Sequence, residues 1–293
     1  MLSPETLLDL AESCGLVARG PLDLTAETDD RQNPSLVITE LRAAAGSRQS
    51  AVNPELPLYP ASMIKLPIAA ALGELWAQGE LGRDESVMIS GANMTGNDVP
   101  PGETLPPLAP GDQVSLEELA TRMLTRSDNV ATNVLIDVLD RRVVTRYARS
   151  LGLTGTELRR KLSSGARLID DPEWDGVGRN AHPAGDSARL FELIARRKIP
   201  GADWIEETLF EQKWNDKLSL GLEPGDRFAH KTGETSKVTH DGGILEMADG
   251  RRFVVVLYTG IPALDHNDAN NQRFGAFMAE LGSFLGRDAR TVF

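Results

Sequence analysis

The sequence is poor in several kinds of residue, and each shortage excludes a class of protein. Cys14 is the only cysteine among 293 residues, so the chain has no internal disulfide. We interpret Cys14 as part of a packed helix, because no neighbouring residue favours its thiolate. Basic residues number 31 against 43 acidic ones, a net charge of −12. This balance argues against binding to nucleic acid or to an anionic membrane, which needs clustered Lys and Arg.

Long apolar runs are also missing. No stretch reaches the roughly 18 apolar residues of a membrane span. The first ten residues have neither a basic region nor a long apolar core, so no signal peptide is visible. As written, the sequence predicts a cytoplasmic protein, and an exported one if a leader was removed beforehand. The 41% hydrophobic content is ordinary for a globular fold.

Hydrophobic periodicity divides the chain into strands at both ends and helices in the middle. We expect strands at 36–38, 227–232, 243–247 and 252–258, and helices at 62–76, 116–124, 130–139, 143–151, 187–195, 204–210 and after 268. The segments 91–111 and 162–184 are rich in Gly, Pro and polar residues and are expected to be loops.

This order of elements predicts an α+β fold. An antiparallel sheet is built from N- and C-terminal segments with flanking helices, and an all-helical lobe is inserted between them. We treat residues 1–293 as one domain. Its α/β lobe comprises 1–75 with 200–293, and its helical lobe comprises 76–199.

The first motif that carries chemistry is Ser62-Met-Ile-Lys65, the only S-x-x-K in the chain. Residues i and i+3 share a helix face, so the two side chains are within reach of each other. Unpaired N–H groups at a helix start favour negative charge on the serine oxygen. Lysine can give up its proton when buried, whereas a guanidinium effectively cannot. The alternative is a surface serine beside a solvated lysine.

Two further motifs follow in order, Ser127-Asp128-Asn129 and Lys231-Thr232-Gly233. The first lies at a turn between two helices, where Ser, Asp and Asn are also ordinary helix caps. The second lies in an expected strand, where alternation sends Lys231 to one face and Thr232 to the other. Gly233 allows a ligand to approach the backbone closely. An ordinary lysine on an edge strand is the alternative for this motif.

A metal site built from the histidines is an alternative that their spacing disfavours. His182, His230, His240 and His266 are scattered, without the H-x-x-x-H or H-E-x-x-H spacing of zinc proteins. We expect hydrogen-bonding roles for them, no metal and no cofactor.

The three motifs together resemble those of class A β-lactamases and penicillin-binding serine hydrolases. The resemblance covers about 36–285 and includes Asn180-Ala-His-Pro183. It implies a β-lactamase/transpeptidase-like fold and acylation of Ser62 by a β-lactam or an acyl-D-alanyl peptide. Lys65 or a water takes the proton, and Ser127 passes it to the leaving nitrogen.

The same family pattern implies the substrate contacts. Asn129 contacts the substrate through its amide, and Lys231 and Thr232 hold its carboxylate beside Gly233. The backbone N–H groups of Ser62 and Glu234 form the oxyanion hole.

One departure from the family concerns the loop after these helices. Class A enzymes use a glutamate there to activate the deacylating water. The family spacing falls near Ser163, where this chain has no carboxylate. Glu173 is the best substitute by residue type, ahead of Asp170, Asp171 and Asp175. Without such a base the acyl-enzyme is hydrolysed slowly.

The sequence therefore predicts a monomeric serine hydrolase that opens β-lactam amides through an acyl-enzyme on Ser62, with slow deacylation. One alternative is a DD-peptidase- or esterase-like hydrolase. The other is a non-catalytic sensor or binder of a β-lactam or peptide.

Overall fold

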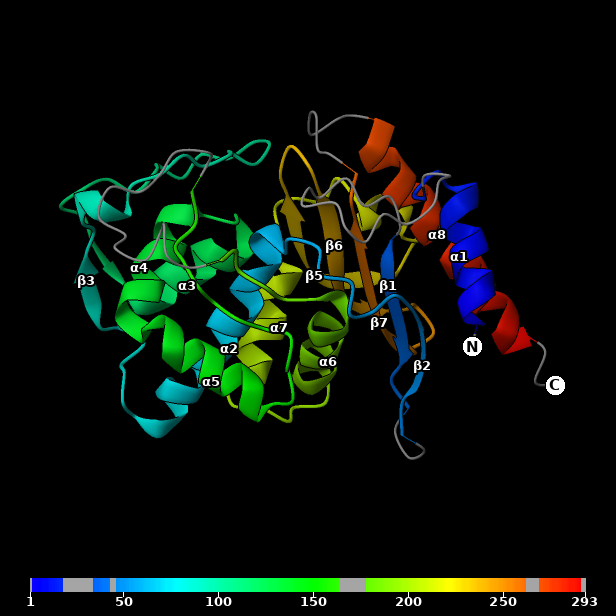
Figure 1. Ribbon diagram of the computed structural model, residues 1–293, viewed down its shortest axis with the longest axis horizontal. Coiled ribbons are helices and arrows are strands. Elements are labelled where there is room, and N and C mark those ends of the chain that lie inside the picture. The colour runs from blue at the N-terminus through cyan, green and yellow to red at the C-terminus, as the bar shows by residue number, and fades with distance from the viewer. Residues whose placement is uncertain (1, 18–33, 43–45, 164–177, 262–268, 291–293) are drawn as a thin grey trace. The chain divides into compact units, whose positions relative to one another are not determined.

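A computed structural model describes residues 2–17, 34–42, 46–163, 178–261 and 269–290. Its main sheet has five strands in the order β2-β1-β7-β6-β5, and all neighbours are antiparallel. The strands are β1 (Ser35–Glu40), β2 (Arg48–Val52), β5 (Arg227–Glu234), β6 (Thr239–Glu246) and β7 (Arg252–Thr259). N- and C-terminal segments thus share one sheet, which confirms the predicted fold class (Figure 1).

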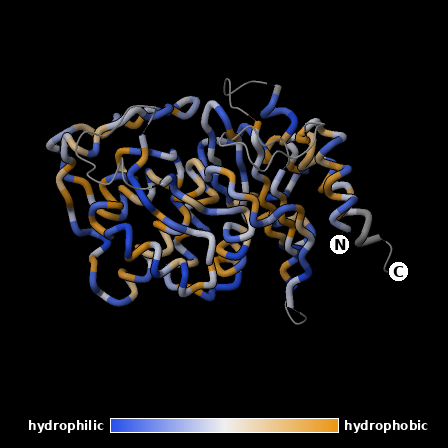
Figure 2. The backbone as a smooth tube through the Cα atoms, in the orientation of Figure 1, coloured by the Kyte–Doolittle hydropathy of each residue, from blue (hydrophilic) through white to orange (hydrophobic). Residues whose placement is uncertain are grey.

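Strand β7 is the centre of this sheet. Its run from Phe253 to Tyr258 is buried, as the continuous apolar sequence predicts. In the register, Val37 of β1 lies opposite Val256 on one side, and Gly242 of β6 lies opposite it on the other. Figure 2 shows hydrophobic stretches along the strands of this sheet.

Two helices from opposite ends of the chain cover one face of the sheet. In Figure 1, α1 (Pro4–Ser13) and α8 (Ala269–Arg290) lie side by side. The expected apolar stripe of α8, from Phe274 to Leu285, is buried in a core shared with α1 and the strands. Ser3 starts α1 by accepting a hydrogen bond from the N–H of Thr6 (3.2 Å), an ordinary helix cap.

A second group of helices makes contacts around α2. These are α2 (Lys65–Gln78), α3 (Leu116–Thr125), α4 (Asn129–Leu139), α5 (Arg141–Ser150) and α7 (Ala202–Phe210). Helix α2 contacts each of the other four, and its buried residues run from Lys65 to Gly73. Helix α3 begins as its sequence predicts, because Ser115 accepts a hydrogen bond from the N–H of Glu118 (3.2 Å).

By contacts, the chain divides into two compact units. Unit 1 comprises 1–63, 182–192 and 215–293, and unit 2 comprises 64–181 and 193–214. Helix α6 (Ala184–Ala195) contributes most of its length to unit 1. Short elements complete the two units: the 3₁₀ turns η1 (Ala61–Ile64), η2 (Gly91–Asn93) and η3 (Leu218–Gly221), and the ribbon of β3 (Ser86–Met88) with β4 (Gln113–Ser115). Among the described helices, none is both long and apolar enough to cross a bilayer.

Candidate active site

Ser62 lies in the tight turn that leads into α2. The 3₁₀ turn η1 spans Ala61–Ile64, and α2 begins at Lys65. Pro67 is the third residue of α2, where a missing N–H costs no helical hydrogen bond. Ala61 has a φ of +47°, a left-handed conformation that an alanine rarely adopts. Ser62 is partly exposed, and its hydroxyl has no hydrogen-bond partner among the described residues.

Lys65 makes several hydrogen bonds within unit 2. It is fully buried, and its ammonium nitrogen Nζ donates to Ser127 O (2.6 Å), Ser127 Oγ (3.0 Å) and Asn129 Oδ1 (2.8 Å). All three acceptors lie within hydrogen-bond distance of the same amine nitrogen. The structure thus brings together one lysine of the first motif and two residues of the second.

In the turn at 127–129, Asp128 caps the next helix and Ser127 has a strained backbone. Asp128 caps α4, with Oδ1 accepting from the N–H groups of Val130 (2.8 Å) and Ala131 (3.0 Å). This confirms the ordinary helix-cap interpretation for Asp128. Ser127 has a φ of +59°, which points to a backbone held against its preference. The indole of Trp214 supports the turn by donating to Arg126 O (3.0 Å).

Two residues that the sequence did not single out fix Asn129. Its N–H donates to Asn97 Oδ1 (2.7 Å), and its side-chain amide donates to Gly96 O (3.1 Å). Asn97 also donates from Nδ2 to Asp128 Oδ1 (2.9 Å). Both residues lie in the segment 91–111 that we predicted as loop. Their only sequence signal is a Gly-Asn pair within a Gly- and Pro-rich stretch, which also fits any turn.

Strand β5 carries the third motif at the edge of the sheet. Thr235 and Val238 are a hydrogen-bonded pair, since the Thr235 N–H donates to Val238 O (2.9 Å). Hydrogen-bonded and non-hydrogen-bonded pairs alternate in an antiparallel ladder. Glu234, opposite Thr239, therefore points its N–H away from β6, toward the open edge of β5. The carbonyl of Thr232 also points away from β6, and it accepts a hydrogen bond from Lys231 Nζ (2.8 Å).

Gly233 lies against the turn that holds Ser62. A Cβ atom on Gly233 would lie 3.1 Å from Pro60 O and 3.1 Å from Ser62 N. A side chain at this position would require the turn to shift by a few tenths of an ångström, so glycine suits the close approach. Within unit 1, the residue before Glu234 is thus in contact with the backbone of Ser62.

Lys231 is fully buried, and the charged residues near it shift its pKa. Burial lowers the pKa of Lys231 to about 7; the neighbouring charge of Lys217 acts in the same direction, while the charges of Asp241 and Glu234 oppose it. Burial also acts to lower the pKa of Lys217, but Glu234 (2.7 Å) and Asp216 (2.9 Å) raise it overall. Lys217 therefore stays charged, whereas Lys231 titrates near neutral pH.

The loop residues predicted to replace the family glutamate lie outside the described residues. These are Asp170, Asp171, Glu173 and Asp175. Asn133 fixes the described start of the loop with two hydrogen bonds. Its Oδ1 accepts from the Leu162 N–H (2.8 Å), and its Nδ2 donates to Leu162 O (2.9 Å). The hydroxyl of Ser163 is buried without a hydrogen-bond partner in the described chain.

Three of the four histidines are described, and all three are buried. His230 Nδ1 lies 2.8 Å from Asp241 Oδ1, and its ring stacks on Phe228. Burial lowers the pKa of His182 to about 3. Over the described ranges, no group of three or more His, Cys, Asp or Glu side chains is arranged to hold a metal ion. His266 lies outside those ranges.

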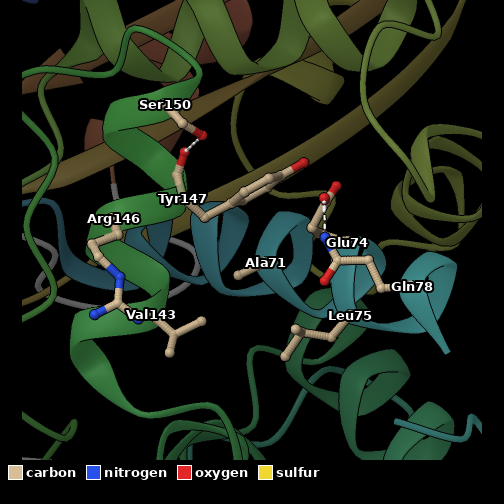
Figure 3. Close-up of a pocket in the computed structure, with 8 residues that line it drawn as sticks. All are labelled: Ala71, Glu74, Leu75, Gln78, Val143, Arg146, Tyr147 and Ser150. Carbon is tan, nitrogen blue, oxygen red and sulfur yellow. Dashed lines mark hydrogen bonds between the residues drawn. The ribbon is translucent and has the colours of Figure 1, made fainter. Parts of the chain in front are cut away.

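A small hollow lies elsewhere in unit 2, between α2 and α5 (Figure 3). Its volume is about 280 Å³, and its lining includes Glu74 and Gln78 of α2 and Arg146 and Tyr147 of α5. Figure 3 shows Tyr147 directed toward α2, and burial together with Glu74 raises the pKa of its phenol. Every lining residue comes from these two helices, and none belongs to the three motifs.

Comparisons with known proteins agree with the fold described above. Solved structures with this fold include "PBP-A" (TM-score 0.75, 24% identity, covering 95% of this chain and 96% of that one). They also include a β-lactamase from Sphaerobacter thermophilus (TM-score 0.69, 23% identity, 85% and 90%) and the extended-spectrum β-lactamase TLA-3 (TM-score 0.75, 15% identity, 97% and 99%). No curated protein sequence matches the chain.

The family model described as "Beta-lactamase enzyme family" matches residues 23–285. The chain belongs to this family and is a hydrolase of the β-lactamase type.

Proposed function

We propose that this protein opens the amide of β-lactams by forming an acyl-enzyme on Ser62, and that it hydrolyses this acyl-enzyme slowly. The observation that carries the proposal is the hydrogen-bonded cluster of Lys65 with Ser127 and Asn129. A buried lysine within hydrogen-bond distance of a second serine hydroxyl provides a route for a proton. Ser62 precedes this lysine by three residues in one continuous turn.

In the proposed acylation step, Ser62 Oγ attacks the lactam carbonyl carbon while Lys65, directly or through a water, accepts the hydroxyl proton. The C–N bond of the ring then breaks, and Ser127 gives its proton to the leaving nitrogen. Lys65 can return a proton to Ser127 along their 3.0 Å hydrogen bond. Protons are therefore conserved, and no cofactor takes part.

The proposed oxyanion hole consists of the N–H groups of Ser62 and Glu234. Two features support it: the outward N–H of Glu234, and the contact of Gly233 with the Ser62 backbone. Such preorganised donors stabilise the negative charge that develops on the carbonyl oxygen. We assign the substrate carboxylate to Lys231 and Thr232, and the substrate amide to Asn129.

Slow hydrolysis of the acyl-enzyme follows from the loop sequence, which has no carboxylate near Ser163. Water attacks an ester slowly unless a correctly placed base activates it. A structure of a leucine-to-glutamate mutant of PBP-A is described as an acyl-enzyme complex with penicillin G. This chain also has a leucine, Leu162, beside Ser163 at the start of the loop.

We expect the wild-type protein to show a burst of acylation followed by a slow steady state. If Glu173 activates the water, Glu173→Gln will lengthen the acyl-enzyme lifetime without changing the acylation rate. If it does not, that variant will match wild type, and Leu162→Glu or Ser163→Glu will accelerate the steady state. Stopped-flow hydrolysis of a chromogenic cephalosporin separates the two phases, with Glu80→Gln, which removes an exposed carboxylate outside the loop, as the control. Fast turnover without a burst, unchanged in all these variants, would contradict slow deacylation.

The charge of Lys231 gives the proposal a pH signature. Because its pKa is about 7, the ammonium that binds the carboxylate is lost as pH rises through neutrality. We expect kcat/KM for a penicillin, which reports groups of the free enzyme, to fall between about pH 6 and pH 9. The decline should disappear in Lys231→Arg, since a guanidinium stays charged. A β-lactam ester without the carboxylate is the control, and an equal decline with this ester would contradict the assignment.

A second candidate is a penicillin-binding relative that is acylated and holds the product, which the likeness to PBP-A favours. Intact-mass detection of the acyl-enzyme, combined with the turnover assay, separates the candidates. An adduct with turnover indicates a β-lactamase, and an adduct with negligible turnover indicates a penicillin-binding protein. Binding with no adduct would indicate a sensor and contradict the acyl-enzyme proposal.

A further inference from the structure

The backbone that presents Ser62 is strained, so other groups have to hold it in place. Ala61 adopts a left-handed conformation immediately before Ser62. Such a conformation persists in a non-glycine residue only when surrounding structure fixes it. Inside the turn, one hydrogen bond from Met63 N–H to Pro60 O (3.0 Å) closes the 3₁₀ geometry. This bond alone does not attach the turn to the sheet.

The sheet reaches the turn at one ladder position of β5 and β6, where Gly233 lies opposite His240. Gly233 contributes close backbone contact with Pro60 and Ser62, as described above. His240 contributes a hydrogen bond, because its Nε2 lies 2.8 Å from Tyr59 O. The Gly233–His240 pair thus contacts the turn at two places. His240 contacts the residue before Pro60, and Gly233 contacts Pro60 and Ser62.

The ring of His240 is fixed in one tautomer. The Thr259 N–H donates to its Nδ1 (3.2 Å), so Nδ1 is the acceptor. The proton of the neutral ring must then lie on Nε2, which donates to the Tyr59 carbonyl. The ring also stacks on Tyr258 at 4.1 Å with an angle of 12° between the planes.

This stack continues into the rest of unit 1. The Tyr258 hydroxyl lies 2.7 Å from Ser187 Oγ of α6, and both residues are fully buried. Burial raises the pKa of Tyr258, so it remains a neutral phenol. His240 therefore has a fixed position, a fixed orientation and a fixed proton, which are the properties of a rigid support.

We propose that His240 is a positioning residue, which holds the Tyr59 carbonyl and thereby fixes Ser62 and its N–H in the reactive geometry. The proposal rests on the proposed function of Ser62 and goes beyond it, because none of the three motifs contains His240. A displacement of about 1 Å at a reacting group can lower a rate by about a hundredfold. Loss of the support should therefore reduce acylation far more than it reduces folding.

Two amide substitutions separate the donor of His240 from its acceptor. The side-chain nitrogen of glutamine lies near the place of Nε2, so His240→Gln keeps the bond to Tyr59 O. Asparagine is shorter, so His240→Asn keeps at most the acceptor for Thr259. We expect acylation within about threefold of wild type for His240→Gln and about tenfold to a hundredfold slower for His240→Asn. His240→Phe, which keeps only the stack, should behave like His240→Asn.

Hydrogen exchange measured by mass spectrometry gives a readout that does not depend on activity. The peptide covering 59–64 should exchange faster in His240→Asn and His240→Phe, and as slowly as wild type in His240→Gln. Leu245→Ala on the same strand is the control for general destabilisation. Leu245 belongs to the core shared with α1 and α8, so this variant should unfold more easily and leave that peptide protected.

Equal acylation and equal exchange in the glutamine and asparagine variants would overturn the proposal, because the ring would then act by packing alone. Wild-type acylation in His240→Asn would overturn it as well. If wild-type protein forms no adduct with a penicillin, the proposed function fails. The exchange measurement then still decides whether His240 holds the turn.

Discussion

Wild-type protein incubated with a penicillin should gain the mass of one ligand, and Ser62→Ala should gain none. The reason is that only an alkoxide-forming side chain at this position can make the ester. The Ser62 hydroxyl has no partner among the described residues, so its removal should change the free energy of unfolding by less than about 1 kcal/mol. Intact-mass spectrometry and a thermal melt measure the two quantities.

Ser62→Cys is the matched control, since it keeps a nucleophile at the same place. A thioester adduct in that variant, with none in Ser62→Ala, locates the chemistry at position 62. The assignment is wrong if Ser62→Ala still forms an adduct that peptide mapping places on another residue.

The two buried motif lysines should differ sharply when each is replaced by arginine. Lys65→Arg keeps the charge but removes any practical base, so the acylation rate should fall by about 10²–10⁴-fold. It also forces a larger planar group among Ser127 and Asn129, which lie 2.6–3.0 Å from the lysine nitrogen. Lys231→Arg keeps the contact with the substrate carboxylate, so its acylation rate should fall much less.

Single-turnover acylation, followed at several penicillin concentrations, separates binding from the chemical step. We expect Lys65→Arg to lower the limiting rate and Lys231→Arg to change mainly the concentration dependence. Equal losses of the limiting rate in both variants would mean that the two lysines act only through their charge.

Much of the fold could be predicted because its elements carry strong local signals. The buried β7, the cap of α3 at Ser115 and the stripe of α8 all follow from hydrophobic period and capping chemistry. Strand β2 was missed, because its Arg48–Val52 sequence is mostly polar and half exposed, as suits an edge strand. The ribbon of β3 with β4 was missed because three-residue strands have no measurable period.

The motif residues could also be located from sequence, but their supports could not. Asn97, Lys217 and His240 act through contacts that depend on a loop path or a strand register. No local pattern distinguishes them from other polar residues. The sequence instead suggested Glu173, which lies outside the described residues, so its role stays a prediction.

The pairing of β1 with β7 has a consequence for how the protein folds. Val37 lies opposite Val256, and the whole helical unit separates them along the chain. A ribosome makes β1 and β2 long before β7 exists, while β5, β6 and β7 follow one another closely. The edge of β1 that pairs with β7, including Leu36–Ile38, therefore stays unpaired until β7 has been made. Long-range pairing of this kind slows folding and exposes intermediates to aggregation. The pairing of β1 with β7 should therefore form later in folding than the local pairing of β5, β6 and β7.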